Sequence, residues 1–69
     1  MVTLYTTPGC LDCKTLRDKL VEIGIDFKEE TNANVMKVKG IAAFPILEAD
    51  GSLMTASAAY EWIDKYQRR

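Results

Sequence analysis

The spacing of apolar residues changes along this chain, and each spacing predicts one type of secondary structure. Residues 2–6 are mainly β-branched, leucine or tyrosine and precede Pro8-Gly9, which indicates a short strand followed by a loop. Over residues 11–23 apolar positions recur every three or four residues, so we expect an amphipathic helix that Gly24 ends. These apolar positions are Cys13, Leu16, Leu20 and Ile23.

Shorter segments follow in the middle of the chain. Residues 25–30 give a second strand, and Thr31-Asn32 offers capping side chains for a short helix over residues 33–38. After Gly40, residues 41–48 and 52–54 are apolar runs on either side of Asp50-Gly51, which predicts a β-hairpin.

A second amphipathic pattern fills the end of the chain. It begins near Thr55 or Ser57, either of which can cap a helix, and its apolar residues have helical spacing. We expect four side chains of this helix in the core: Ala59, Trp62, Ile63 and Tyr66.

The predicted element order is β-α-β-α-β-β-α. A strand, a helix and a second strand in succession predict a parallel pair, and the hairpin adds two antiparallel strands. We therefore predict an α/β fold in which residues 1–69 form one domain, with a mixed four-stranded sheet and helices on both of its faces.

Composition excludes several classes of function. Nine basic and ten acidic residues leave a net charge of -1, which does not suit binding to nucleic acid. The apolar stretches are far shorter than the ~20 residues that cross a bilayer, and no basic and apolar leader is seen. We expect a monomer in the cytoplasm, without membrane contact.

Cys10 and Cys13 carry the chemical signal. They lie three residues apart at the predicted junction of strand and helix, and the chain has no histidine. A disulfide that closes so short a loop constrains the unfolded chain little, so this spacing indicates redox chemistry or metal binding. Two thiolates fill only half of a tetrahedral zinc or iron-sulfur site, and a metal-binding module would therefore need a dimer or an external thiol.

Residues 6–14 read Thr-Thr-Pro-Gly-Cys-Leu-Asp-Cys-Lys, and Pro45 precedes the hairpin. With the β-β-α ending, the chain resembles a minimal glutaredoxin of the thioredoxin superfamily over essentially its whole length. The resemblance implies the thioredoxin-like fold and a thiol-disulfide oxidoreductase that carries electrons in cell redox homeostasis. It implies Cys10 and Cys13 as the catalytic pair, a redox-active disulfide and no bound cofactor or metal.

The two cysteines are expected to have different roles. Cys10 lies at a helix N-terminus, where backbone N–H groups stabilise a thiolate, so its pKa should fall below the free value of ~8.5. Cys13 lies one turn deeper and is expected to be buried. Cys10 would attack a substrate disulfide, and Cys13 would resolve the mixed disulfide.

The resemblance also implies a substrate groove. In glutaredoxins the proline that matches Pro45 is cis, and the backbone of the preceding residue, here Phe44, pairs with an extended substrate. The residues that we expect to contact substrate are Thr7, Pro8, Leu11, Asp12, Phe44, Pro45, Thr55 and Ser57.

Some positions depart from the usual glutaredoxin pattern. Leu11-Asp12 stands where Pro-Tyr is common, and the charge of Asp12 should make Cys10 less acidic and the couple more reducing. Thr7 replaces a basic residue, and residues 55–58 replace a Gly-Gly-x-Asp-like stretch. The resemblance implies glutathione or a thioredoxin-reductase-like enzyme as the electron donor and a protein or small-molecule disulfide as the substrate. Similarly sized redoxins feed ribonucleotide reductase, which gives one candidate protein substrate.

Overall fold

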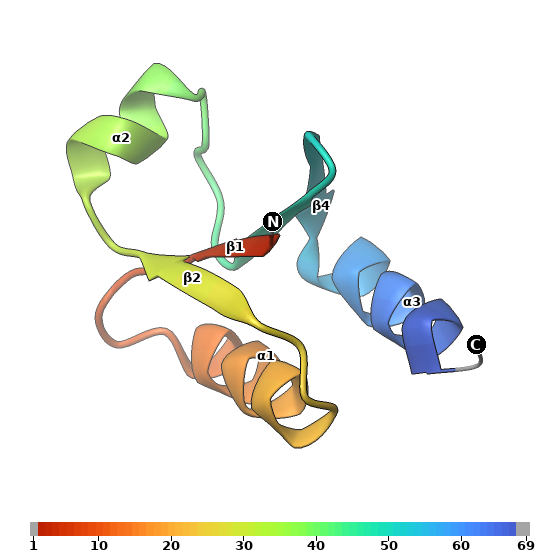
Figure 1. The fold of residues 1–69 in the computed structure, drawn as a ribbon. Helices are drawn as coiled ribbons and strands as arrows, with labels where there is room; N and C mark the ends of the chain where they lie inside the picture. Colours follow the sequence, from red (N-terminus) through yellow and green to blue (C-terminus); the bar gives the residue numbers. More distant parts are fainter. Residues whose placement is uncertain (1, 68–69) are drawn as a thin grey trace.

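The computed structural model describes residues 2–67 of the chain. Its element order is the predicted one, and Figure 1 shows the elements in chain order. The bounds are β1 (Val2–Tyr5), α1 (Leu11–Glu22), β2 (Phe27–Glu30), α2 (Ala33–Val38), β3 (Ile46–Ala49), β4 (Ser52–Thr55) and α3 (Ala56–Gln67).

The strands form one mixed sheet in the order β2-β1-β3-β4. β1 lies inside the sheet, parallel to β2 and antiparallel to β3, and β4 pairs antiparallel with β3. A parallel neighbour requires a crossover connection, which α1 supplies between β1 and β2. The predicted mixed four-stranded sheet is thereby confirmed.

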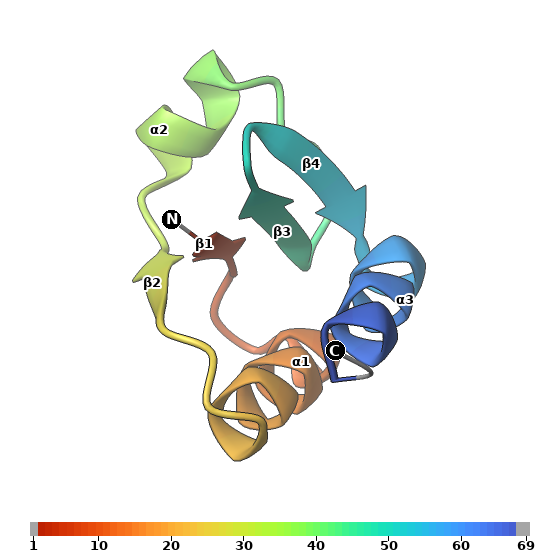
Figure 2. The ribbon, with the colours of Figure 1, turned by 45° about the vertical axis from the view of Figure 1, so that its right-hand side comes forward.

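Helices cover both faces of this sheet, as predicted. α1 and α3 lie together on one face and α2 lies on the other, an arrangement that Figures 1 and 2 show from two directions. Because successive side chains of a strand point to opposite faces, Leu4 and Leu47 contact the α1 and α3 layer, whereas Tyr5 and Ile46 point toward α2.

The two faces differ in how much apolar surface they bury. The cluster beneath α1 and α3 is the larger core and consists of Leu4, Leu16, Leu20, Ile25, Leu47, Ala59 and Ile63. The cluster beneath α2 has only three buried members, namely Tyr5, Met36 and Ile46. Most of the hydrophobic stabilisation therefore comes from the α1 and α3 face.

Several predicted turns and caps are present. The amide of Asn34 donates to the side-chain oxygen of Asn32 at 2.9 Å, which caps α2 at its N-terminus. Gly24 follows α1 with φ of 77°. Asp50 and Gly51 have φ values of 52° and 80°, the left-handed pair that a two-residue hairpin turn requires.

Three expectations were wrong. The first hairpin strand begins at Ile46 and not at residue 41, because Pro45 has no N–H to donate to a strand ladder. The second strand, β2, begins at Phe27, two residues after the predicted start at residue 25. Tyr66 is 42% exposed and does not lie in the core. Trp62 packs against the core one turn earlier, and Tyr66 stacks on it with ring centroids 5.6 Å apart.

No helix within residues 2–67 is long and apolar enough to cross a bilayer. The longest, α1 and α3, have 12 residues each, well under the ~20 that the hydrocarbon core demands.

Removing a core side chain should destabilise the fold far more than removing an exposed one of the same type. Leu47 is fully buried on β3, so Leu47→Ala should lower the free energy of unfolding by about 2–5 kcal/mol. Urea denaturation measures this loss. Leu53 on the neighbouring strand is 48% exposed, and Leu53→Ala should cost well under that amount. Equal losses in the two variants would contradict the assigned core.

Candidate functional site

The cysteines lie where the chain leaves the sheet and begins a helix. β1 ends at Tyr5, residues 6–10 turn at the end of the sheet, and α1 begins at Leu11. Gly9 has φ of 79°, a left-handed conformation that glycine adopts without the strain of a side chain. The Pro8-Gly9 turn thereby brings Cys10 to the first position before α1.

Cys10 is the N-cap of α1. Its backbone is extended, with φ of -88° and ψ of 109°, and its Sγ accepts a hydrogen bond from the Cys13 amide at 3.0 Å. Serine, threonine or aspartate oxygens usually fill this role at a helix N-terminus. The sulfur therefore accepts from an N–H that has no partner within the helix, and it lies at the positive end of the helix dipole. In the reduced protein both features favour the thiolate form of Cys10.

Cys10 and Cys13 form a disulfide, with Cα atoms 5.2 Å apart. The two side chains differ in exposure, because Cys13 is only 4% exposed whereas Cys10 is partly accessible. A reagent or substrate that approaches from solvent meets the Cys10 sulfur first. This difference agrees with the separate roles expected for the two cysteines.

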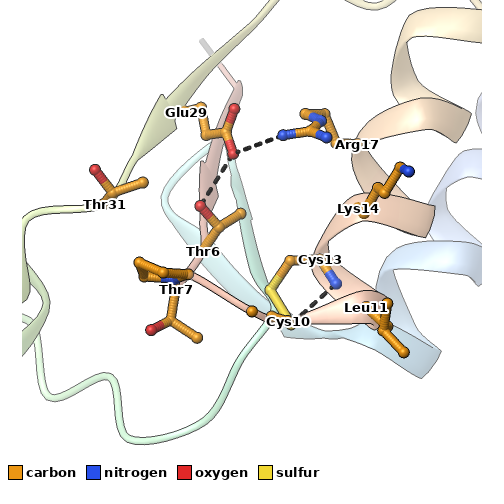
Figure 3. Close-up of a pocket in the computed structure, with 11 residues that line it drawn as sticks. Thr6, Thr7, Cys10, Leu11, Cys13, Lys14, Arg17, Glu29 and Thr31 are labelled. Carbon is orange, nitrogen blue, oxygen red and sulfur yellow. Dashed lines mark hydrogen bonds and ion pairs between the residues drawn. A yellow bond between two sulfur atoms is a disulfide. The ribbon is translucent and has the colours of Figure 1, made fainter.

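A hollow of about 370 Å³ lies beside the disulfide, between α1 and the end of β2 (Figure 3). Both cysteines contribute to its wall, together with the predicted contact residues Thr7, Pro8 and Leu11. Leu11 is 82% exposed, which leaves an apolar side chain in solvent next to Cys10. The wall also contains residues that the sequence analysis did not predict as substrate contacts: Thr6, Gly9, Lys14, Arg17, Glu29 and Thr31.

A polar network closes one side of this hollow. The Thr6 hydroxyl donates to Glu29 Oε2 at 3.0 Å, and Arg17 lies 3.5 Å from the same oxygen, as the dashed lines in Figure 3 show. Thr6 is only 3% exposed, so its hydroxyl needs this partner. The network joins β1, β2 and α1. Strand alternation could have indicated it, since Glu29 shares a sheet face with Phe27 and so points toward α1.

Two of the other predicted contact residues, Pro45 and Thr55, lie at the cysteine end of the sheet. Tyr5 pairs with Ile46 and Ile46 pairs with Thr55, so Pro45 and Thr55 reach the same end of the sheet as the cysteine loop. The Phe44–Pro45 peptide bond is cis, as the family resemblance implied. Pro45 is buried, whereas Phe44 is 36% exposed.

Asp12 and Ser57 are both exposed, in the first turns of α1 and α3 respectively. The described hollow is not lined by Asp12, Phe44, Pro45, Thr55 or Ser57. The structure thus places the predicted contact residues in two groups at one end of the sheet.

The site holds few groups that suit a metal. Within residues 2–67 no group of three or more cysteine, aspartate or glutamate side chains comes close enough to hold an ion. A metal at Cys10 and Cys13 would need the disulfide to be reduced and further ligands from outside this part of the chain.

Comparison with solved structures agrees with the architecture, and comparison with known sequences finds a relative. No family model matches the sequence. The gene 56 protein of Mycobacterium phage L5 is 39% identical over 56 residues, covering 71% of this chain and 54% of the phage protein. The chain therefore spans about half the length of that relative. A crystal structure of a mutant of a thioredoxin-like protein matches with a TM-score of 0.73 and 17% identity, over 99% of this chain and 96% of that one.

The exposure difference predicts selective alkylation of the reduced protein. Iodoacetamide should modify Cys10 rapidly and Cys13 slowly, because Cys13 is only 4% exposed in the first turn of α1. Peptide mass spectrometry after short exposure measures the two rates. Comparable rates at the two cysteines would contradict the assignment of Cys10 as the accessible sulfur.

The charge at Asp12 should oppose ionisation of Cys10. Because a nearby carboxylate disfavours a thiolate, Asp12→Asn should lower the pKa of the Cys10 thiol and move the alkylation profile to lower pH. Asp18, exposed further along the same helix, provides the control Asp18→Asn. The interpretation of Asp12 fails if both variants follow the wild-type profile.

Proposed function

Starting from the thioredoxin-like fold of this chain, we propose that it is a dithiol thiol-disulfide oxidoreductase of the glutaredoxin-like type. The observation that carries the proposal is the Cys10–Cys13 disulfide at the N-terminus of α1, with one accessible and one buried sulfur. A structural disulfide in so short a loop would stabilise the chain little, whereas a redox pair needs this asymmetry.

The proposed reaction uses the reduced form. The Cys10 thiolate attacks one sulfur of a substrate disulfide, whose S–S bond breaks and releases a first thiolate, which takes up a proton. The product is a mixed disulfide between Cys10 and the substrate. Cys13 then loses its proton and attacks Cys10 Sγ, which releases the second substrate thiolate. The substrate has gained two electrons and the chain has formed its Cys10–Cys13 disulfide.

The residues around the sulfurs support each step. The Cys13 amide, which donates to Cys10 Sγ at 3.0 Å, would hold negative charge on that sulfur before the attack and during its displacement. Burial of Cys13 would keep its thiol protonated until the mixed disulfide forms, because burial disfavours the charged form. Leu11, next to Cys10, and Phe44 both offer exposed apolar surface for a polypeptide substrate.

The cycle requires a reductant for the oxidised chain. We propose glutathione or a thioredoxin-reductase-like enzyme as this donor, in the reducing environment of a cytoplasm. Thr7 carries no charge for a glutathione carboxylate, which favours the enzyme, while Lys14 and Arg17 line the hollow and could contribute cations instead. Reducing the oxidised chain with glutathione and, separately, with thioredoxin reductase and NADPH distinguishes the two donors.

Trapping the mixed disulfide tests the mechanism. Cys13→Ser lacks the resolving sulfur, so incubation with a disulfide-bonded protein such as insulin should leave a covalent adduct on Cys10. Non-reducing electrophoresis and mass spectrometry detect this adduct. Cys10→Ser is the matched variant, and it should form little adduct because its remaining sulfur is buried.

Two results would oppose the proposal. Failure of Cys13→Ser to form an adduct at Cys10, while the variant remains folded, would remove the mechanism. A stoichiometric zinc or iron chromophore in freshly purified protein that survives dialysis would favour the alternative, a metal- or iron-sulfur-binding module that uses both thiolates in a dimer.

A further inference from the structure

The loop over residues 40–45 joins α2 to β3 and carries Phe44 and Pro45 to the cysteine end of the sheet. One end of this loop is fixed, because Ile46 pairs with Tyr5 in the sheet. The other end depends on α2, a six-residue helix with one buried side chain, Met36. Val35 and Ile41 pack against the cluster that contains Met36 but are only partly buried, and Val38 is 88% exposed, so apolar packing contributes little at this end.

Tyr5, Lys39 and Glu48 form a charged cluster at this end of the loop. The Tyr5 hydroxyl donates to Glu48 Oε1 at 2.7 Å, and Lys39 Nζ lies 3.2 and 3.4 Å from the two Glu48 oxygens. The same ammonium lies 5.8 Å from the centre of the Tyr5 ring, within range of a cation–π contact. The cluster therefore fixes one lysine by two kinds of interaction.

The electrostatics of this cluster are mutually reinforcing. Two hydrogen bonds lower the pKa of Glu48, the one from Tyr5 more strongly than the one from Lys39. The pKa of Lys39 is raised most by its interaction with Tyr5 and next by its interaction with Glu48. The pKa of Tyr5 is raised mainly by burial and secondly by the hydrogen bond to Glu48. All three groups therefore keep the protonation states that hold the cluster together at neutral pH.

Lys39 is placed where it can control the loop. It is the C-cap of α2, and Gly40 follows with φ of 75°. The Gly40 amide donates to the Lys37 carbonyl at 3.1 Å and the Ile41 amide to the Met36 carbonyl at 2.9 Å. These bonds make the turn after the helix rigid, so the position of Lys39 sets the direction in which the loop departs.

We propose that Lys39 is a positioning residue for substrate binding: by pairing with Glu48 it anchors the loop over residues 40–45 and so holds Phe44 at the cysteine end of the sheet. The inference rests on the proposed oxidoreductase function. Lys39 itself touches no reacting atom. Its loss should weaken the binding of a polypeptide substrate and leave the sulfur chemistry unchanged.

Steady-state kinetics of Lys39→Met with insulin as substrate tests the proposal. KM should rise by between about twofold and fivefold, the range that a partly exposed ion pair supports, while kcat changes little. Lys39→Arg keeps the charge and should restore most of the affinity. Lys37→Met removes an exposed lysine of the same helix and should behave as the wild type.

Two further measurements separate this inference from the proposed function. In two-dimensional NMR, amide signals of residues 39–44 should shift in Lys39→Met while those of α1 stay in place, a readout that needs no activity. About 0.5 M sodium chloride should raise the wild-type KM toward that of the variant by screening the ion pair. This salt test on the wild type applies even if a variant folds poorly.

An unchanged KM in Lys39→Met, or an equal rise in Lys37→Met, would overturn the role of Lys39. A parallel fall of kcat would do the same, because it would place the residue in the sulfur chemistry. If Cys13→Ser traps no mixed disulfide on Cys10, the proposed function fails first, and the NMR comparison still decides whether Lys39 anchors the loop.

Discussion

The hydrogen bond from the Cys13 amide to the Cys10 sulfur connects the fold of this protein to its proposed chemistry. A helix that begins at Leu11 has unpaired N–H groups in its first turn, and here a sulfur atom accepts from one of them. The sulfur must therefore lie in the helix cap and also face solvent. The Pro8-Gly9 turn after β1 brings Cys10 to the position where both requirements are met.

Local patterns in the sequence were sufficient for most of the fold. Asn32 and Asp50-Gly51 have side chains or backbone freedom that favour one conformation whatever surrounds them, and the structure has a cap and a turn at these positions. The cysteine pair was found in the same way. Its spacing and its position before an amphipathic helix are local properties.

Features that depend on distant residues were harder to predict. Glu29 reads as a surface residue of a charged strand, and only the packing of α1 against that strand gives it Thr6 and Arg17 as partners. Residues 41–45 have the apolar character of a strand, but Pro45 has no N–H to donate to a neighbouring strand, so β3 begins only at Ile46. Tyr66 has the spacing of a core residue, but Trp62 already fills that part of the core.

The unequal clusters on the two faces of the sheet also affect the native ensemble. The α1 and α3 face holds the larger core, so its opening requires nearly the full free energy of unfolding. The α2 face buries only three side chains and can open in a smaller, local fluctuation while the sheet stays intact. Such a fluctuation breaks the Lys39–Glu48 ion pair and releases residues 40–45, while the larger core on the α1 and α3 face stays closed.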